Sequence, residues 1–140
     1  MAFHRSLIAD SRQQRTRIDC HPALMRAARA RAESLISRDY WAHCDPDGVC
    51  PNLVARRAGC RLPSDYGDRA NYIEELGAGT PDPAVMFTAL GNSPAHKTHL
   101  FGEIDFYRRQ PHVGIVLVEG GRWGWVWVVL IGTCGAVSGE

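Results

Sequence analysis

Apolar positions recur at helical spacing early in the chain. Pro22 suits a first helical turn, because the N–H groups of that turn have no helical partner anyway. The pattern after it predicts a helix to about Arg38 that buries one stripe, made of Leu24, Ala28, Ala32, Leu35 and Ile36. The preceding residues 4–17 are more polar and are predicted to form a first helix.

The last third of the chain changes from helical to alternating periodicity. Two apolar runs, residues 112–119 and 122–132, flank Gly120-Gly121 and predict a β-hairpin closed by a two-residue glycine turn. The tryptophans of the second run alternate, so they are expected to share one face. That face is either a covered side of the sheet or an aromatic wall beside a binding groove, formed by Trp123, Trp125 and Trp127.

Turn residues divide the middle of the chain into shorter elements. Residues 40–50 are rich in them and predict a loop, after which Pro51 opens a short helix that Gly59 closes. Residues 61–70 predict an exposed connection. Residues 71–79 predict a short strand followed by a glycine-rich turn.

Two further helix starts are visible before the hairpin. Thr80 is predicted to cap a helix that begins at the next residue and ends at Gly91. Ser93 is predicted to cap a short helix that opens at Pro94, so that His96 lies in its first turn.

The order of these elements is helices, a short strand, helices and a hairpin. This order predicts an α+β fold in which helices cover an antiparallel sheet. The chain has 140 residues and a hydrophobic fraction of 45%, which fits one domain over residues 1–140 with its own core.

Composition restricts the classes of partner. The formal net charge is +1, too balanced for nucleic acid to be the main partner. No apolar run reaches the ~18 residues of a membrane-spanning helix. Many arginines lie between Arg5 and Arg38, where they predict a solvated helix face or, alternatively, a surface for anionic membranes or polymers.

The cysteine content favours an oxidising compartment. The chain carries Cys20, Cys44, Cys50, Cys60 and Cys134. Cys44 and Cys50 bracket a short loop that a local disulfide can close, and the other three then compete for one further bond. The odd count leaves one thiol free or paired to another chain, and the spacing lacks the C-x2-C pairs of zinc ribbons. The N-terminus lacks the apolar region of a signal peptide, so the chain is either cytosolic or a mature secreted protein without its leader.

Polar residues that singly suggest only caps or surface positions fall into an ordered series of motifs. The motifs are YWAHCDPDG at 40–48, NYIEELGAG at 71–79, NSPAHKTHL at 92–100 and HVGIVLVEGGRWGWVWVVLIG at 112–132. The series resembles the CAP superfamily of cysteine-rich secretory, antigen-five and pathogenesis-related-one proteins, and in particular its small bacterial members with an SCP-like domain. The resemblance implies an α-β-α sandwich with a central antiparallel sheet flanked by helices, and an extracellular location.

The resemblance also implies a surface cleft lined by two histidines and acidic residues. His43, Glu74 and His96 match the cleft positions of the family, and Ser93 stands where many animal and plant members carry a second glutamate. The asparagine that usually follows the first glutamate is replaced by Glu75. Some family members are reported to hold zinc in this cleft. Two neutral imidazoles and a carboxylate are a competent set for such a metal, which makes His43, His96 and Glu74 its candidate ligands.

Three functions are compatible with these features. The preferred hypothesis is an extracellular domain that binds a lipid, small molecule or partner protein, with peripheral membrane contact and without a required cofactor. The second is a zinc-dependent hydrolase, a peptidase or cell-wall enzyme, that uses the same cleft. The third is a cytosolic protein with redox-active cysteines. A nucleophilic Cys44 is disfavoured, because it directly follows His43 and would need His96 or His99 as its base.

Overall fold

The computed structural model describes residues 1–135 of the chain. Its elements are α1 (Ala2–Ala9), β1 (Asp19–Cys20), α2 (Pro22–Arg38), α3 (Pro51–Arg57), β2 (Glu74–Ala78), α4 (Pro83–Gly91), α5 (Pro94–Leu100), α6 (Asp105–Arg108), β3 (His112–Glu119) and β4 (Trp125–Gly132). Within the described part of the chain, no helix combines the length and the apolar character needed to cross a membrane.

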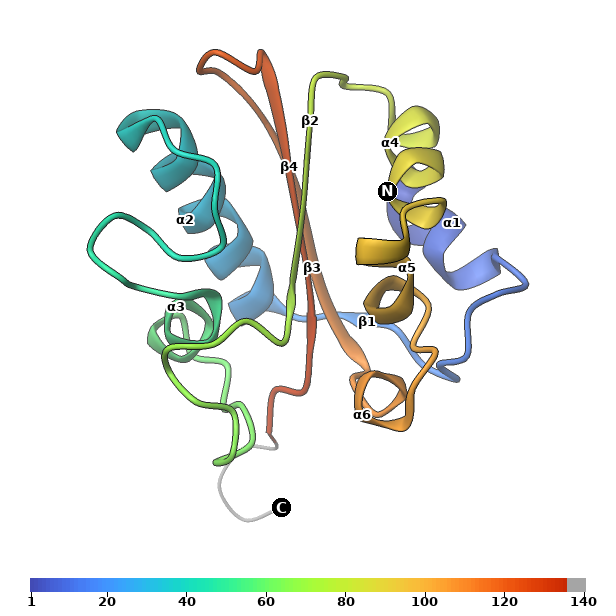
Figure 1. The fold of residues 1–140 in the computed structure, drawn as a ribbon. Coiled ribbons are helices and arrows are strands. Elements are labelled where there is room, and N and C mark those ends of the chain that lie inside the picture. Colours follow the sequence, from blue (N-terminus) through green and yellow to red (C-terminus); the bar gives the residue numbers. More distant parts are fainter. Residues whose placement is uncertain (136–140) are drawn as a thin grey trace.

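The strands form one sheet in the order β1-β3-β4-β2. Figure 1 shows this sheet edge-on, with α2 and α3 on one face and α1, α4 and α5 on the other. The predicted α-β-α sandwich is therefore confirmed. β2, β4 and β3 are antiparallel neighbours, as expected, and the two-residue β1 adds a short parallel pairing to β3. Residues 136–140 of the predicted domain lie outside the described residues.

Strand alternation supplies a core on each side of the sheet. In β4 the even-numbered Val126, Val128 and Leu130 pack with α2, whereas the odd-numbered Trp127, Val129 and Ile131 pack with α1 and α4. Because both faces are covered, β4 is buried along nearly its whole length. The same alternation places Glu74 and Glu75, neighbours on β2, on opposite faces of the sheet.

Helix α2 matches its prediction at both ends. Its predicted stripe is buried, apart from Ile36, which is half-buried. Gly114 of β3 explains how closely this helix approaches the sheet, because a Cβ at that position would collide with the backbone of Leu24. The helix ends at Asp39, which has a left-handed backbone with φ of 53°.

Two predicted helix boundaries are wrong, and one predicted connection is less exposed than expected. The first helix ends at Ala9 rather than near residue 17, because Asp10 is extended. Helix α4 starts at Pro83 instead of directly after Thr80, since the Asp82 side chain accepts hydrogen bonds from the N–H groups of its first turn. The 61–70 connection is exposed in the main, but Leu62 and Tyr66 are buried in the core.

The hairpin is present, but its turn and its tryptophan face differ from the prediction. β3 ends at Glu119 and β4 starts only at Trp125, so the loop spans 120–124 rather than two residues. Trp123 lies in this loop and packs on the α2 side with Trp41, at 5.0 Å between ring centroids. Trp127 is buried on the opposite face beside Phe3. The tryptophans therefore do not share one face.

Two disulfides cross-link the described part of the chain. Cys44 bonds Cys50 across the short loop, as the spacing indicated, and Cys60 bonds Cys134 near the end of β4. Cys20 is the free thiol among the described residues, and it is exposed. Since Cys44 is oxidised, it is not available as a nucleophile, and the cysteines of the two bonds do not form a zinc site.

Candidate functional site

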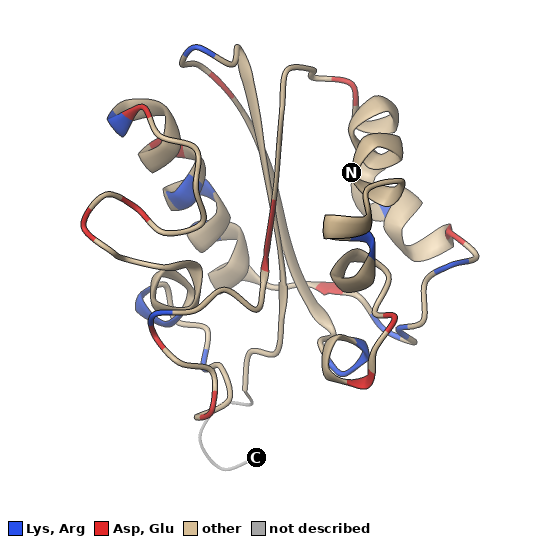
Figure 2. Ribbon diagram, viewed as in Figure 1, with Lys and Arg blue, Asp and Glu red and all other residues tan. Residues whose placement is uncertain are grey.

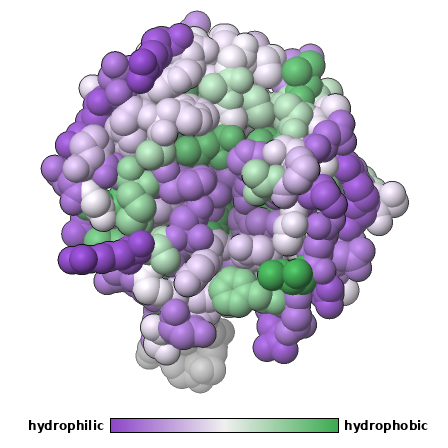
Figure 3. Space-filling model, in the orientation of Figure 1, coloured by the Kyte–Doolittle hydropathy of each residue, from purple (hydrophilic) through white to green (hydrophobic). Residues whose placement is uncertain are grey.

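A cleft of about 310 Å³ opens along the outer side of β2. Figure 3 shows this face hollowed near its middle, with hydrophilic residues at the base. In Figure 2 the acidic residues of β2 are visible at the centre of the same face. The cleft is lined by His43, Asn71, Tyr72, Ile73, Glu74, Glu75, Pro94, Ala95, His96, Thr98, His99 and Tyr107.

On the α2 side of β2, Glu74 is fixed by a permanent cation. Arg31 donates from Nε to Oε2 at 2.6 Å and from Nη2 to Oε1 at 3.0 Å, and both side chains are almost fully buried. His43 also donates from Nδ1 to Glu74 Oε1, at 2.9 Å. Glu74 raises the pKa of Arg31, and this effect outweighs the opposing effect of burial. The carboxylate thus pairs with a permanent cation and accepts three hydrogen bonds.

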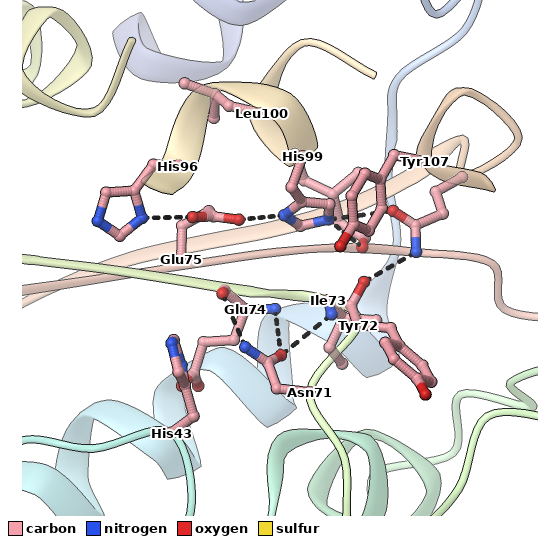
Figure 4. A network of polar contacts seen from close by, with 12 residues as sticks. His43, Asn71, Tyr72, Ile73, Glu74, Glu75, His96, His99, Leu100 and Tyr107 are labelled. Atoms are coloured by element: carbon pink, nitrogen blue, oxygen red, sulfur yellow. Dashed lines mark hydrogen bonds and ion pairs between the residues drawn. The ribbon is translucent and has the colours of Figure 1, made fainter. Parts of the chain in front are cut away.

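On the α5 side of β2, Glu75 binds two imidazoles. His96 Nδ1 lies 2.5 Å from Oε1, and His99 Nδ1 contacts Oε2 (Figure 4). Burial alone would raise the pKa of Glu75, but the charge of His99 and the hydrogen bonds of both imidazoles lower it. The hydrogen bond to Glu75 raises the pKa of His96, although burial opposes this. On this side of the cleft, the carboxylate is therefore compensated by imidazoles and not by a permanent cation.

Further hydrogen bonds hold His99 and the end of α5 in place. His99 Nε2 lies 3.0 Å from both Gln110 Oε1 and the Ile131 carbonyl, which joins α5 to the sheet. Arg15, also buried, donates to the carbonyls of His99 and Leu100 at the end of α5. Burial lowers the pKa of Arg15 to about 10. These contacts orient the helix that carries His96.

Asn71 fixes the backbone at the first residue of β2. Its Oδ1 accepts the N–H groups of Ile73 at 3.1 Å and Glu74 at 2.8 Å, and its Nδ2 donates to the Glu74 carbonyl at 3.2 Å. The side chain therefore occupies the outer edge of the strand at Glu74, as Figure 4 shows. Its contacts fix the backbone from which both carboxylates project.

The structure brings three of the four predicted cleft residues together. His43 comes from the loop that the Cys44–Cys50 disulfide closes, Glu74 from β2 and His96 from the first turn of α5. Ser93 does not line the cleft. It occupies the N-cap position of α5, but its side chain makes no capping hydrogen bond, so the predicted side-chain cap is wrong.

The donor set does not fit a resident metal held by His43, His96 and Glu74. Both oxygens of Glu74 already accept hydrogen bonds from Arg31 or His43. Over residues 1–135, no group of three or more histidine, cysteine, aspartate or glutamate side chains is placed to hold a metal ion. The cleft itself offers the Nε2 atoms of His43 and His96, which are fewer ligands than the three that catalytic zinc sites use.

Sequence reasoning missed Arg31 and Arg15, and it considered His99 only as a base for Cys44, not as a partner of Glu75. The early arginines were expected to be solvated, yet Arg31 and Arg15 are buried because internal oxygens accept their hydrogen bonds. Arg31 had a signal in the sequence: it follows Leu24 by seven residues and precedes Leu35 by four, which places a charge on the buried stripe. Such a charge requires an internal partner of opposite sign.

Comparison with solved structures identifies the architecture. The chain superimposes on an extracellular protein containing an SCP domain from Bacillus anthracis with a TM-score of 0.67 and 13% identity, over 94% of this chain and 41% of that one. It superimposes on an outer surface protein from Borrelia burgdorferi with a TM-score of 0.65 and 20% identity, over 86% and 80% of the two chains. The chain has a CAP fold. No protein-family model matches it, and no curated protein does.

The CAP fold explains why residues distant in sequence meet at this cleft. His43 and Glu74 are 31 residues apart, and His96 and Glu75 are 21 apart. The sandwich brings the loop after α2 and the start of α5 to the two sides of one edge strand. The matched cleft residues are thus neighbours through the fold and not through local structure.

Proposed function

We propose that this CAP domain is a binding module whose cleft takes a polar ligand and performs no chemistry on it. One observation carries the proposal. Two imidazoles, on opposite sides of β2, are each bound through Nδ1 by a glutamate of that strand. Each carboxylate fixes a ring, and the Nε2 of each ring has no hydrogen-bond partner within residues 1–135.

The free Nε2 atoms provide hydrogen bonds of either direction. A neutral imidazole whose Nδ1 carries the proton accepts at Nε2, and an imidazolium donates there. The pKa of His96 is raised by Glu75, so this ring gains donor character as the pH falls toward its ordinary range. The cleft can therefore bind a ligand that presents both acceptors and donors.

The lining favours a polar ligand over a lipid chain. Among the polar side chains that border the cleft, His43 and His96 are partly exposed, and an alkyl chain placed there would have to desolvate them. Tyr72 and Tyr107 add aromatic rings to the lining.

An extracellular location fits the covalent structure. Two disulfides persist in oxidising compartments and are rare in the cytosol. The two structures that share the fold are an outer surface protein and an extracellular protein. The proposal therefore includes an extracellular location. This location argues against the third hypothesis, a cytosolic protein with redox-active cysteines.

The test uses the histidine side chains as reporters. The full chain, labelled with 15N, is titrated with alanyl-alanine amide, N-acetylglucosamine, inorganic phosphate and short-chain phosphatidylcholine. We expect at least one polar probe to shift the Nε2 resonances of His43 and His96 saturably, and to be recovered unaltered. The double variant His43→Phe/His96→Phe, which keeps the rings and removes their nitrogens, should lose this binding.

A matched control is His21→Phe, which lies at the N-cap of α2 and does not line the cleft. Equal thermal midpoints of the wild type and the double variant would show that any loss of binding is local. The proposal fails if no polar probe binds, if the double variant binds as tightly as the control, or if a probe is consumed.

A further inference from the structure

β2 forms one outer edge of the sheet, because the strand order is β1-β3-β4-β2. It pairs with β4 along its inner side, with Glu74 opposite Leu130. In an antiparallel pair, residues alternate between those whose backbone groups bond the neighbouring strand and those whose groups point away from it. Alternate residues of β2 therefore direct an N–H and a carbonyl outward.

Two hydrogen bonds at the ends of β2 fix the phase of this alternation. The Ile131 N–H donates to the Ile73 carbonyl at 2.8 Å. The Gly79 N–H donates to the Trp125 carbonyl at 3.0 Å. The odd-numbered residues of β2 thus bond β4, and the even-numbered residues present their backbone groups at the outer edge.

Asn71 shows what this edge binds. Its carboxamide accepts from the Glu74 N–H and donates to the Glu74 carbonyl, at 2.8 and 3.2 Å. A neighbouring strand makes the same reciprocal pair of bonds to a residue whose groups point outward. The Asn71 side chain therefore makes the bonds that one residue of a neighbouring strand would make, and the outward backbone groups beyond Glu74 remain unpaired.

The unpaired part of the edge consists of Leu76, which is 7% exposed, and Ala78, which is half-buried. Their outward N–H and carbonyl groups have no hydrogen-bond partner within residues 1–135. The two residues are about 7 Å apart, because a strand rises about 3.4 Å per residue. Donor and acceptor pairs at this repeat match the backbone of an extended chain, which is how peptides add to sheet edges.

Proteins commonly protect edge strands with lysine, proline, a bulge or inward-pointing charges. β2 contains no lysine or proline and pairs with β4 in a continuous register without a bulge. Its inward-pointing charges, Glu74 and Glu75, come before the unpaired residues Leu76 and Ala78. The opposite edge, β1, has two residues and so offers a ladder too short to hold a peptide. β2 is therefore the better of the two edges for strand addition.

We propose that the outer edge of β2 binds the backbone of an extended peptide, which adds to the sheet as a fifth strand. The peptide pairs with Leu76 and Ala78, and its continuation enters the cleft between His43 and His96. Its side chains alternate toward the two sides of the sheet, so successive residues meet the two walls of the cleft. This inference names the ligand class for the proposed function and rests on it to that extent.

The first test exploits the repeat of two residues. Random heptapeptides displayed on phage are selected against the full chain, and the enriched peptide is synthesised with a fluorophore for anisotropy titration. Each amide of this peptide is then methylated in turn. We expect methylation to weaken binding at least tenfold at alternate residues and less than twofold at the residues between them. Failure to enrich any peptide, or losses without alternation, would overturn the proposal.

The second test changes the protein edge. Ala78→Pro removes an outward N–H without removing a bond to β4, and we expect it to weaken peptide binding at least tenfold. Ser64→Pro is the matched control, since Ser64 is exposed and follows Pro63 in a turn closed by the Tyr66 N–H. Equal affinity of the two proline variants would contradict the proposal. If Ala78→Pro does not fold, the methylation pattern on the wild-type chain still decides.

Amide hydrogen exchange gives a third readout on the unaltered chain. Without peptide, the N–H groups of Leu76 and Ala78 should exchange faster than those of Glu75 and Gly77, which bond β4. Saturating peptide should slow the exchange of Leu76 and Ala78 at least tenfold. Unchanged exchange at both residues would count against strand addition.

The outcomes separate this inference from the proposed function. An alternating methylation pattern that is unaffected by His43→Phe/His96→Phe supports the edge and contradicts the role of the imidazoles. Peptide binding that depends on both histidines but shows no alternation supports the cleft and contradicts the edge.

Discussion

Glu74 and Glu75 are neighbours on one strand, yet their charges are compensated in different ways. Glu74 faces Arg31, a permanent cation, in an ion pair whose side chains are 0% and 2% exposed. Glu75 faces His96 and His99, whose charge depends on pH. Because β2 alternates, the two walls of one cleft differ: on the α2 wall the carboxylate pairs with a permanent cation as well as an imidazole, and on the α5 wall it pairs only with imidazoles.

The largest expected effect comes from breaking the fixed pair. Arg31→Leu leaves Glu74 buried without its cation, and we expect a loss of about 3–5 kcal/mol in the free energy of unfolding, measured by urea denaturation. The double variant Arg31→Leu/Glu74→Leu should recover most of this loss, since it leaves no unpaired charge. A double variant no more stable than Arg31→Leu would show that the pair stabilises the fold beyond mutual neutralisation.

The α2 wall also has a covalent constraint that the α5 wall lacks. The Cys44–Cys50 disulfide closes a loop with a sequence separation of 6 next to His43. Removing it with Cys44→Ser/Cys50→Ser should cost about 2 kcal/mol, from the loop-closure entropy of the unfolded chain. The loss is measured by denaturation against the oxidised wild type, so that the Cys60–Cys134 bond is present in both proteins. An unchanged stability would mean that the loop is ordered by its other contacts, such as Arg31 to the Ala42 carbonyl.

The titrating wall should respond less strongly to loss of its carboxylate. Glu75→Gln removes the charge but keeps an amide that bonds the same region, and we expect a loss of about 1.5 kcal/mol. NMR titration should show the pKa of His96 falling in this variant, because the carboxylate raises it in the wild type. A pKa of His96 that does not move would contradict the assignment of the raised value to Glu75.

The fold was predictable where periodicity is strong. The stripe of α2 and the alternation of the hairpin predicted a helix-covered sheet, and both hold. The predicted two-residue turn of the hairpin was wrong. Gly124 has a positive φ, as Gly120 and Gly121 do, so the loop continues to residue 124 and β4 begins only at Trp125. The start of α4 was wrong because Asp82 and Pro83 together define a stronger N-terminus than Thr80.

The site was only partly predictable for a different reason. His43, Glu74 and His96 emerged from motif resemblance, but their hydrogen bonds join segments at least 21 residues apart. No local pattern shows that Glu75 bonds His99 as well, since this contact depends on how α5 packs against the sheet. Arg31 could have been found, because its place on an apolar stripe demands a buried partner.

The smallest effect, and the sharpest test of the comparison, is the pH dependence of stability. The folded pKa of His96 is raised above 6.5, so its stabilisation is fully present below that pH and is lost as the pH rises through the folded value. The folded pKa of Glu75 is lowered from 4.5, so its stabilisation is present above that pH and is lost as the pH falls through the folded value. The α5 wall is therefore most stabilising between these two limits.

His96→Gln isolates the upper limit. We expect the free energy of unfolding of the wild type to decline above pH 6.5 relative to the variant, because the raised pKa of His96 stabilises the folded state only while the ring is protonated. Burial lowers the pKa of His112, which acts with the opposite sign near the same pH, but this contribution cancels in the difference. Urea denaturation of both proteins across the range measures it. If the two unfolding free energies change with pH in parallel, protonation of His96 does not stabilise the fold through Glu75. The two walls of the cleft would then not differ in how stability depends on pH.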